Sequence, residues 1–192
     1  MANNKRIYII HGWDGSPKGE WFPWIKKELE KRGYNVTIPE MPNPEEPIIK
    51  DWVNYISEVV EKPDNETYFI GHSIGCQAIM RYLETVDQRI GGVVFVAGYF
   101  KLTNLESDEE EKIAKPWLKT PIDFNKIKKT TDKITAIFSD NDQFVPLASS
   151  KDVLKQKLDA KIVIERNKGH FDEDSGIFEV PTVLKEILEI IG

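Results

Sequence analysis

The chain has 192 residues, of which 40% are hydrophobic and 30% charged, and its net charge is −6. This is the composition of a soluble globular protein, long enough for one domain with a full core and short for two. The acidic balance argues against a nucleic-acid-binding surface, which is normally basic, and no apolar run approaches the roughly 20 residues of a membrane span.

Short apolar segments rich in Ile, Val, Tyr and Phe recur along the chain and predict β-strands. The central segments are nearly continuous apolar runs, as expected of parallel strands that are buried on both faces. Segments with apolar residues at helical spacing alternate with them, which predicts one mostly parallel sheet with helices on both faces. Gly33 is placed to end the first helix. We expect strands over residues 6–10, 35–38, 67–70, 92–97, 134–138 and 161–165, and helices over 21–32, 47–61, 73–85, 147–158 and 180–191.

One connection, residues 98–132, is too long for an ordinary loop of a compact domain. It is expected to form a functional flap or to carry small helices, and residues 109–114 are a candidate helix. Lysines cluster near its end, at 126–133, where a solvated surface segment is the preferred interpretation. The strands on both sides belong to one sheet, so residues 1–192 are predicted to form a single domain.

Residues 71–75 read GHSIG and fit the pattern G-x-S-x-G, after an apolar run and before a helix-like stretch. The pattern alone is weak, but a nucleophilic serine in this context sits on a strained strand-to-helix turn that lifts its hydroxyl clear of the sheet. Gly71 and Gly75 would remove side chains that collide with the neighbouring strand or helix. The alternative is that Ser73 simply caps the helix.

A nucleophilic serine needs a base and a group that orients the base. Of the three histidines, His72 is a poor base because neighbouring side chains at such a turn point in different directions. His170 follows the last predicted strand, at the carboxyl edge where open α/β sheets place their sites. Asp142 follows the strand over 134–138 in a D-x-x-V-P pattern. The order Ser73, Asp142, His170 is that of the α/β-hydrolases.

Two further predictions concern the surroundings of this triad. Asp140 competes with Asp142 but is interpreted as a turn residue, and the acids after His170 as solvated or capping. The backbone N–H groups of Ile74 and Trp13 are predicted to form an oxyanion hole, with His11 holding the Trp13 loop. Among the tryptophans, we expect Trp24 in the core and Trp13 and Trp117 in a substrate pocket.

The motifs HGWDGSP, WFPW, GHSIG, SDNDQFVP and GHF together resemble the small serine hydrolases related to retinoblastoma-binding protein 9. The resemblance covers nearly the whole chain. It implies a three-layer α/β-hydrolase fold of about six strands without a large lid domain, a triad of Ser73, Asp142 and His170, and activity on small acyl substrates. The L-x-C-x-E peptide used for retinoblastoma binding is absent, because the only cysteine lies in SIGCQAI, so no retinoblastoma-type partner is expected.

The sequence therefore predicts a serine hydrolase, specifically a carboxylesterase for small-molecule acyl esters. The alternatives are an amidase or thioesterase with the same triad, or a hydrolase-fold binding module with little activity. No metal or cofactor is expected, since neither H-E-x-x-H nor Cys/His spacing occurs. One cysteine and no signal-like apolar run predict a cytoplasmic protein. We further expect a monomer or homodimer without nucleic-acid or membrane partners.

Overall fold

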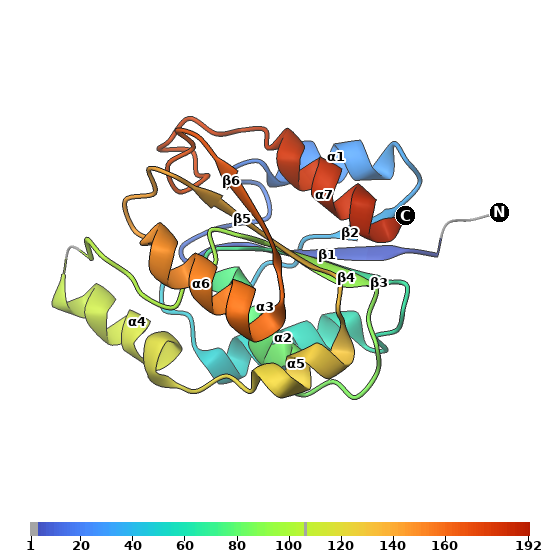
Figure 1. Ribbon diagram of the computed structural model, residues 1–192, viewed down its shortest axis with the longest axis horizontal. Coiled ribbons are helices and arrows are strands. Elements are labelled where there is room, and N and C mark those ends of the chain that lie inside the picture. Colours follow the sequence, from blue (N-terminus) through green and yellow to red (C-terminus); the bar gives the residue numbers. More distant parts are fainter. Residues whose placement is uncertain (1–3, 106) are drawn as a thin grey trace.

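The computed structural model describes residues 4–105 and 107–192, and its centre is a six-stranded parallel sheet of order β2-β1-β3-β4-β5-β6 (Figure 1). The strands are β1 (Arg6–Ile10), β2 (Asn35–Thr37), β3 (Thr67–His72), β4 (Gly92–Val96), β5 (Ile134–Ser139) and β6 (Lys161–Glu165). The helices are α1 (Phe22–Glu30), α2 (Ile49–Val60), α3 (Ile74–Leu83), α4 (Asp108–Lys119), α5 (Phe124–Thr130), α6 (Leu147–Leu158) and α7 (Pro181–Ile191).

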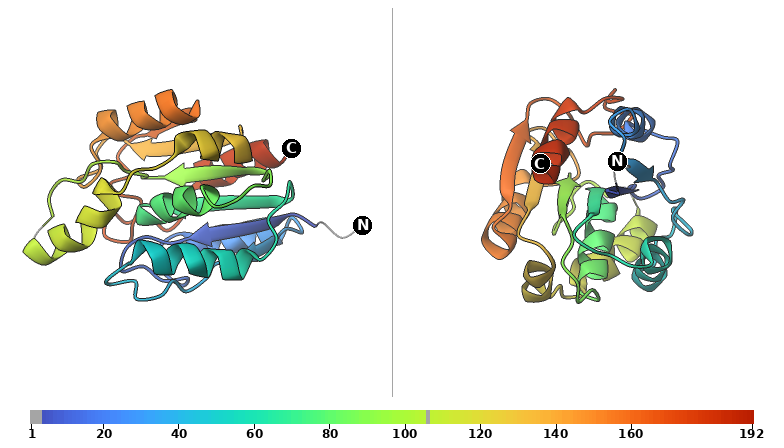
Figure 2. Two further views of the ribbon diagram at one scale, coloured as in Figure 1. Left: turned by 90° about the horizontal axis from the view of Figure 1, so that it is seen from below. Right: turned by 90° about the vertical axis from the view of Figure 1, so that its right-hand side faces the viewer.

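Helices cover both faces of the sheet and give three layers. Helices α1 and α7 lie together on one face, while α2, α3, α5 and α6 lie on the other (Figures 1 and 2). Alternate side chains of each strand enter the two resulting cores. In β4, for example, Val93 and Phe95 enter the core under α3, and Val94 and Val96 enter the core under α7. The predicted α/β class and its sheet are confirmed.

The strand order places a switch point between β1 and β3. After β1 the chain turns to β2 at one edge, and from β3 onward it builds the sheet in the opposite direction. Open parallel sheets bind their ligands outside the carboxyl ends of the strands at such a point. The loop that follows β1 and the turn that follows β3 therefore meet where a site is expected.

The end of α1 follows the predicted chemistry. The Gly33 amide donates to the Glu30 carbonyl at 2.9 Å and the Tyr34 amide to the Leu29 carbonyl at 3.3 Å, and Gly33 has a φ of +83°. This is the Schellman arrangement, in which a left-handed residue closes the helix and satisfies its last carbonyls.

The segment 98–132 carries two helices rather than one. The candidate helix at 109–114 is a longer one, α4, which begins after the Ser107 cap and has four acidic residues in its first turn, a favourable charge at a helix N-terminus. The interpretation of the lysine-rich stretch as a plain surface segment is incomplete. Residues 124–130 form α5, because Asp123 caps its start and Ile127 packs into the core. Within the described residues, no helix is long and apolar enough to cross a membrane.

Gly75 allows α3 to start directly against β1. A Cβ at this position would lie 2.3 Å from the Ile10 carbonyl oxygen and 2.6 Å from that of His11. Because both atoms are buried backbone that cannot rotate away, Gly75→Ala is expected to lower the free energy of unfolding by about 3 kcal/mol or to prevent folding. Denaturant unfolding followed by circular dichroism measures the loss.

Gly19→Ala is the matched control for this substitution. Its added methyl group would meet only ordinary contacts of 3.6 Å or more, so we expect a change within about 0.5 kcal/mol. Equal unfolding midpoints for the two variants would contradict the packing argument.

Candidate active site

Ser73 occupies a one-residue turn between the end of β3 and the start of α3. Its φ of 52° and ψ of −121° lie outside the usual regions for a residue with a side chain, at a cost of about 1–3 kcal/mol. The Ser73 amide donates to the Val96 carbonyl at 2.9 Å, which ties the turn to β4. The Ser73 side chain caps nothing in α3, so the helix-cap alternative does not describe what the hydroxyl does.

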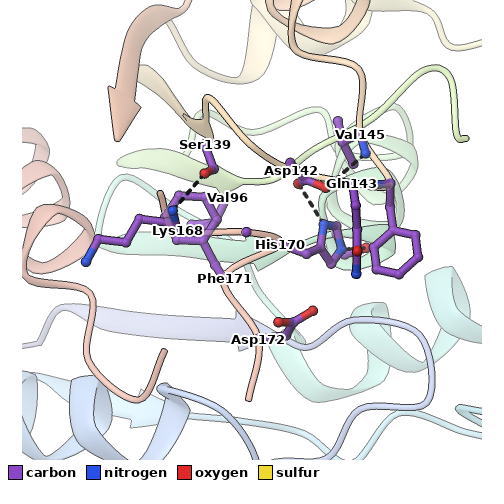
Figure 3. A network of polar contacts seen from close by, with 12 residues as sticks. Val96, Ser139, Asp142, Gln143, Val145, Lys168, His170, Phe171 and Asp172 are labelled. Atoms are coloured by element: carbon purple, nitrogen blue, oxygen red, sulfur yellow. Dashed lines mark hydrogen bonds and ion pairs between the residues drawn. The ribbon is translucent and has the colours of Figure 1, made fainter. Parts of the chain in front are cut away.

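The Ser73 hydroxyl instead contacts His170. His170 Nε2 lies 2.9 Å from Ser73 Oγ, and His170 Nδ1 lies 2.8 Å from Asp142 Oδ2. Figure 3 shows the Asp142–His170 contact, with Asp142 reaching the ring from the loop after β5. Since a carboxylate can only accept, Nδ1 carries the proton and Nε2 is free to accept from the serine hydroxyl.

Asp142 is fixed by its own loop. Its Oδ1 accepts from the amides of Phe144 at 2.9 Å and Val145 at 3.0 Å, and its side chain is 3% exposed. The D-x-x-V pattern therefore has a physical meaning: one carboxylate oxygen holds the turn and leaves the other for His170. The Phe144 ring packs edge-on against the His170 ring, with centroids 5.4 Å apart.

Asp140 binds backbone in the loop after β6, and not in its own turn as the sequence predicts. It is exposed, and its Oδ1 accepts from the Asn167 amide at 2.9 Å. Asp172 caps a turn, since its Oδ1 accepts from the Ser175 amide. Neither residue is hydrogen-bonded to the His170 ring.

A second network joins the loops after β5 and β6, and sequence analysis does not predict it. Ser139 Oγ accepts from the Lys168 amide at 3.0 Å (Figure 3), and Asn141 Oδ1 accepts from the Gly169 amide at 2.9 Å. The Ser139 hydroxyl also donates to Asn141 Oδ1 at 2.7 Å. These bonds hold the chain just before His170. The only signal in the sequence is the polar stretch SDND itself, which turn chemistry already explains.

His11 lies in the loop that follows β1, where its ring holds the backbone. Its Nδ1 donates to the Gly12 carbonyl at 2.8 Å and its Nε2 accepts from the Met41 amide at 3.1 Å. Burial lowers the pKa of His11, in keeping with a neutral ring. Gly12, the next residue, lies close to the serine, since a Cβ added to Gly12 would lie 3.4 Å from the Cβ of Ser73.

The two amides predicted for an oxyanion hole belong to the residues that directly follow Gly12 and Ser73. Ile74 begins α3 directly after the serine, and Trp13 follows Gly12 in the loop after β1. In the part of the chain that the structure describes, neither amide donates a hydrogen bond to another protein group. Trp13 and Ser73 both line one cavity.

This cavity has a volume of about 820 Å³ and opens at the carboxyl edge of the sheet. His170 lines it together with Ser73, so the hydrogen-bonded pair faces open space. Apolar walls come from the segment 98–132, through Leu102, Leu105 and Ile113. The described residues contain no group of three or more His, Cys, Asp or Glu side chains that could hold a metal ion.

A family model described as serine hydrolase matches residues 7–189 of this chain. The chain belongs to the serine hydrolase family. It is 37% identical over 182 residues to YdeN of Bacillus subtilis, and the matched region covers 93% of this chain and 92% of that protein. It is 30% identical over 191 residues to the serine hydrolase RBBP9 of Rattus norvegicus, with 98% of each chain covered. The family resemblance predicted from the motifs is confirmed.

Solved structures support the same fold. The crystal structure of the ydeN gene product of B. subtilis matches with a TM-score of 0.88 and 34% identity, over 97% of this chain and 98% of that one. Est1E from Butyrivibrio proteoclasticus matches with a TM-score of 0.75 and 16% identity, over 100% of this chain and 90% of that one. The second likeness concerns the fold alone. The predicted α/β-hydrolase fold without a large lid domain is confirmed.

One aromatic prediction for this serine hydrolase is wrong. Trp117 is 1% exposed, packs edge-on against Trp52 with centroids 5.9 Å apart, and donates from Nε1 to the Pro47 carbonyl. It belongs to the core because α4 turns this side chain toward α2 and away from the cavity. Trp24 packs partly buried against the core under α1, as expected, and Trp13 is half-buried at the cavity.

Proposed function

We propose that this serine hydrolase is a carboxylesterase for small acyl esters, with Ser73 as nucleophile, His170 as base and Asp142 as the group that orients the base. The observation that carries the proposal is the continuous hydrogen-bonded series from Asp142 through His170 to Ser73 at the wall of an open cavity. Serine, imidazole and carboxylate in this geometry are the parts that acyl transfer requires.

In the proposed reaction, His170 Nε2 takes the hydroxyl proton as Ser73 Oγ attacks the ester carbonyl. The tetrahedral intermediate collapses when His170 gives that proton to the departing alcohol, which leaves an acyl group on Ser73. Water then enters, His170 takes one of its protons, and the water oxygen attacks the acyl carbonyl. As this second intermediate collapses, the bond to Ser73 Oγ breaks, His170 returns the proton to Oγ, and the acid is released. Asp142 keeps the imidazole in the tautomer with the Nδ1 proton and stabilises its charged form.

The Ile74 and Trp13 amides are proposed to hold the oxyanion of the intermediate. Support comes from their free donors within the described part of the chain, from the position of Ile74 at the N-terminus of α3, and from the close approach of Gly12 to Ser73. The first amides of a helix are unpaired and carry partial positive charge. Donors fixed before the reaction stabilise charge where it develops, which is commonly the largest single catalytic effect.

The cavity disfavours an anionic substrate. Carboxylates surround its apolar wall, and among the described residues that line it there is no lysine or arginine. A cleft with charges of one sign repels ligands of that sign. The acidic residues that line it are Asp14, Glu20, Glu45, Glu109, Glu110, Asp172, Glu173 and Asp174.

A series of p-nitrophenyl esters tests the activity and the acyl pocket together. We expect kcat/KM to rise from acetate to butyrate and hexanoate, by up to about fourfold per methylene as the chain contacts the apolar wall, and to fall for palmitate, which outgrows it. Release of p-nitrophenolate measures each rate. If the protein hydrolysed none of these esters, the esterase proposal would be contradicted.

Matched compounds make the result specific. p-Nitrophenyl hemisuccinate is close in size to the butyrate and hexanoate esters and differs from them mainly by its negative charge. It is expected to react at least about tenfold more slowly than they do. The anilide and the thioester of butyric acid compare leaving groups at a constant acyl chain. Faster turnover of either would overturn the ester preference and favour an amidase or a thioesterase.

A cytoplasmic location is also proposed. It rests on Cys76, the single thiol of the chain, which is free and buried in α3. Burial raises the pKa of this thiol, so it stays protonated and unreactive. Proteins of reducing compartments commonly carry such unpaired cysteines.

A further inference from the structure

The ring of His72 lies buried beneath the proposed triad, between two acceptors. Its Nε2 is 2.7 Å from the backbone carbonyl oxygen of His170, and its Nδ1 is 3.0 Å from Glu20 Oε2. The side chain of His72 is 2% exposed and that of Glu20 is 16% exposed. His72 therefore joins two loops that are far apart in sequence, directly behind the proposed base.

The two contacts favour an imidazolium over a neutral imidazole. A carbonyl oxygen can only accept, so Nε2 must donate to His170. A neutral ring then presents its Nδ1 lone pair to the Glu20 carboxylate, which is repulsive at 3.0 Å. An imidazolium donates from Nε2 to the carbonyl and brings its positive charge to the carboxylate, so both contacts are favourable. The Nδ1–Glu20 contact is an ion pair and not a hydrogen bond, because its atoms are not aligned for one.

The surroundings hold this pair in place. The rings of Trp21 and Phe22 pack edge-on against His72, each with centroids 6.1 Å apart. Glu20 has a φ of 55°, and its amide donates to Glu173 Oε1 at 2.7 Å. The Glu20 amide thus joins the loop before α1 to the loop after β6.

We propose that His72 is a positioning residue that works as an imidazolium, paired with Glu20, and holds the main chain of His170 so that the His170 ring stays over Ser73. This rests on the proposed function of the triad. His72 does not touch the reacting atoms, because its Nε2 is engaged by the carbonyl and its Nδ1 by Glu20. Its contribution is to fix the proposed base and to place a positive charge beside it.

The titratable groups that face the His72 ring come from three loops. They are Glu20 from the loop before α1, Asp172 and His170 from the loop after β6, and His11 from the loop after β1. Burial opposes protonation, but the Glu20 carboxylate, the His170 carbonyl and Asp172 favour it, and the pKa of His72 is raised above its ordinary value. The direction of this shift favours the imidazolium form of the ring.

Glu20→Gln is the decisive variant, because it removes the carboxylate and keeps nearly the same volume. We expect kcat for butyrate ester to fall about tenfold with KM changed less than about twofold, as befits a loss of alignment rather than of binding. His72 lies between Glu20 and the His170 carbonyl, so its charge is the nearer one to His170. Losing that charge is expected to move the acid-side half-maximum of kcat/KM upward by about 0.5 pH unit.

Ring-nitrogen NMR reports the same change without using activity. The chain has three histidines, so long-range ¹H–¹⁵N spectra with selective ¹⁵N labelling resolve each ring. At about pH 7.5 the unmodified protein is expected to show the imidazolium pattern for His72, and Glu20→Gln the pattern of a neutral ring. Glu46→Gln is the control: Glu46 is an exposed loop carboxylate that does not line the cavity, and it should match the unmodified protein in both measurements.

A neutral His72 in the unmodified protein under these conditions would overturn the proposal. So would a Glu20→Gln protein that has a neutral His72 but retains the full kcat and the original pH profile. If no ester is hydrolysed at all, the proposed function fails, while the spectra still decide the charge of His72 and its dependence on Glu20.

Discussion

Ser73→Ala is expected to abolish covalent labelling by a fluorophosphonate probe and to lower kcat/KM for ester hydrolysis by about 10⁵-fold. The reason is the geometry of the hydroxyl, which is 2.9 Å from His170 Nε2 and bonded to nothing in its own helix. Alanine removes only this oxygen. It keeps the Cβ and accepts the same backbone angles, so the fold and the cavity should persist.

Ser149→Ala is the matched control for the labelling experiment. The Ser149 hydroxyl donates to the Pro146 carbonyl and lies in α6, away from the lining of the cavity. This variant should label fully and keep its activity. Retained labelling in Ser73→Ala, with a normal far-ultraviolet circular dichroism spectrum, would reject Ser73 as the nucleophile.

The parts of the site that sequence analysis identifies are those fixed by local backbone rules. A strand must end and a helix must begin around Ser73, and the glycine at 75 is required because α3 starts against the Ile10 carbonyl. Asp142 follows the same logic, since its bonds to Phe144 and Val145 are local to one turn. Strand ends of a parallel sheet share one edge, so chain order is enough to bring Ser73, Asp142 and His170 into one neighbourhood.

The parts that sequence analysis misses depend on contacts between distant segments. The sequence indicates that His72 is a poor base, but it does not indicate what the ring binds. The bond from His72 to the His170 carbonyl spans 98 positions in the sequence, and no local pattern predicts it. Glu20 carries no motif and gains meaning only because the loop after β1 folds over the end of β3. The prediction for Trp117 fails for the same reason. An amphipathic pattern predicts that a helix buries one face, and it does not say which neighbour that face meets.

Asp142→Asn is expected to lower kcat for ester hydrolysis by about 10⁴-fold. The amide oxygen of the new side chain would still accept from the amides of Phe144 and Val145, so the turn survives. That bonding leaves only the side-chain NH₂ group to face His170 Nδ1, which lies 2.8 Å from the carboxylate oxygen that this group replaces. An N–H donor there forces the imidazole proton onto Nε2, and the ring can no longer accept the proton of Ser73. A steady-state assay with the butyrate ester measures the loss.

Asp140→Asn separates this tautomer argument from a general loss of charge. The substitution removes one negative charge from the same loop, while its side-chain oxygen can still accept from the Asn167 amide, so kcat should stay within about threefold. If Asp140→Asn proved severe and Asp142→Asn mild, Asp140 would be the orienting carboxylate. If both were mild, His170 would not depend on a carboxylate at all, and the proposed mechanism would lose the group that sets its tautomer.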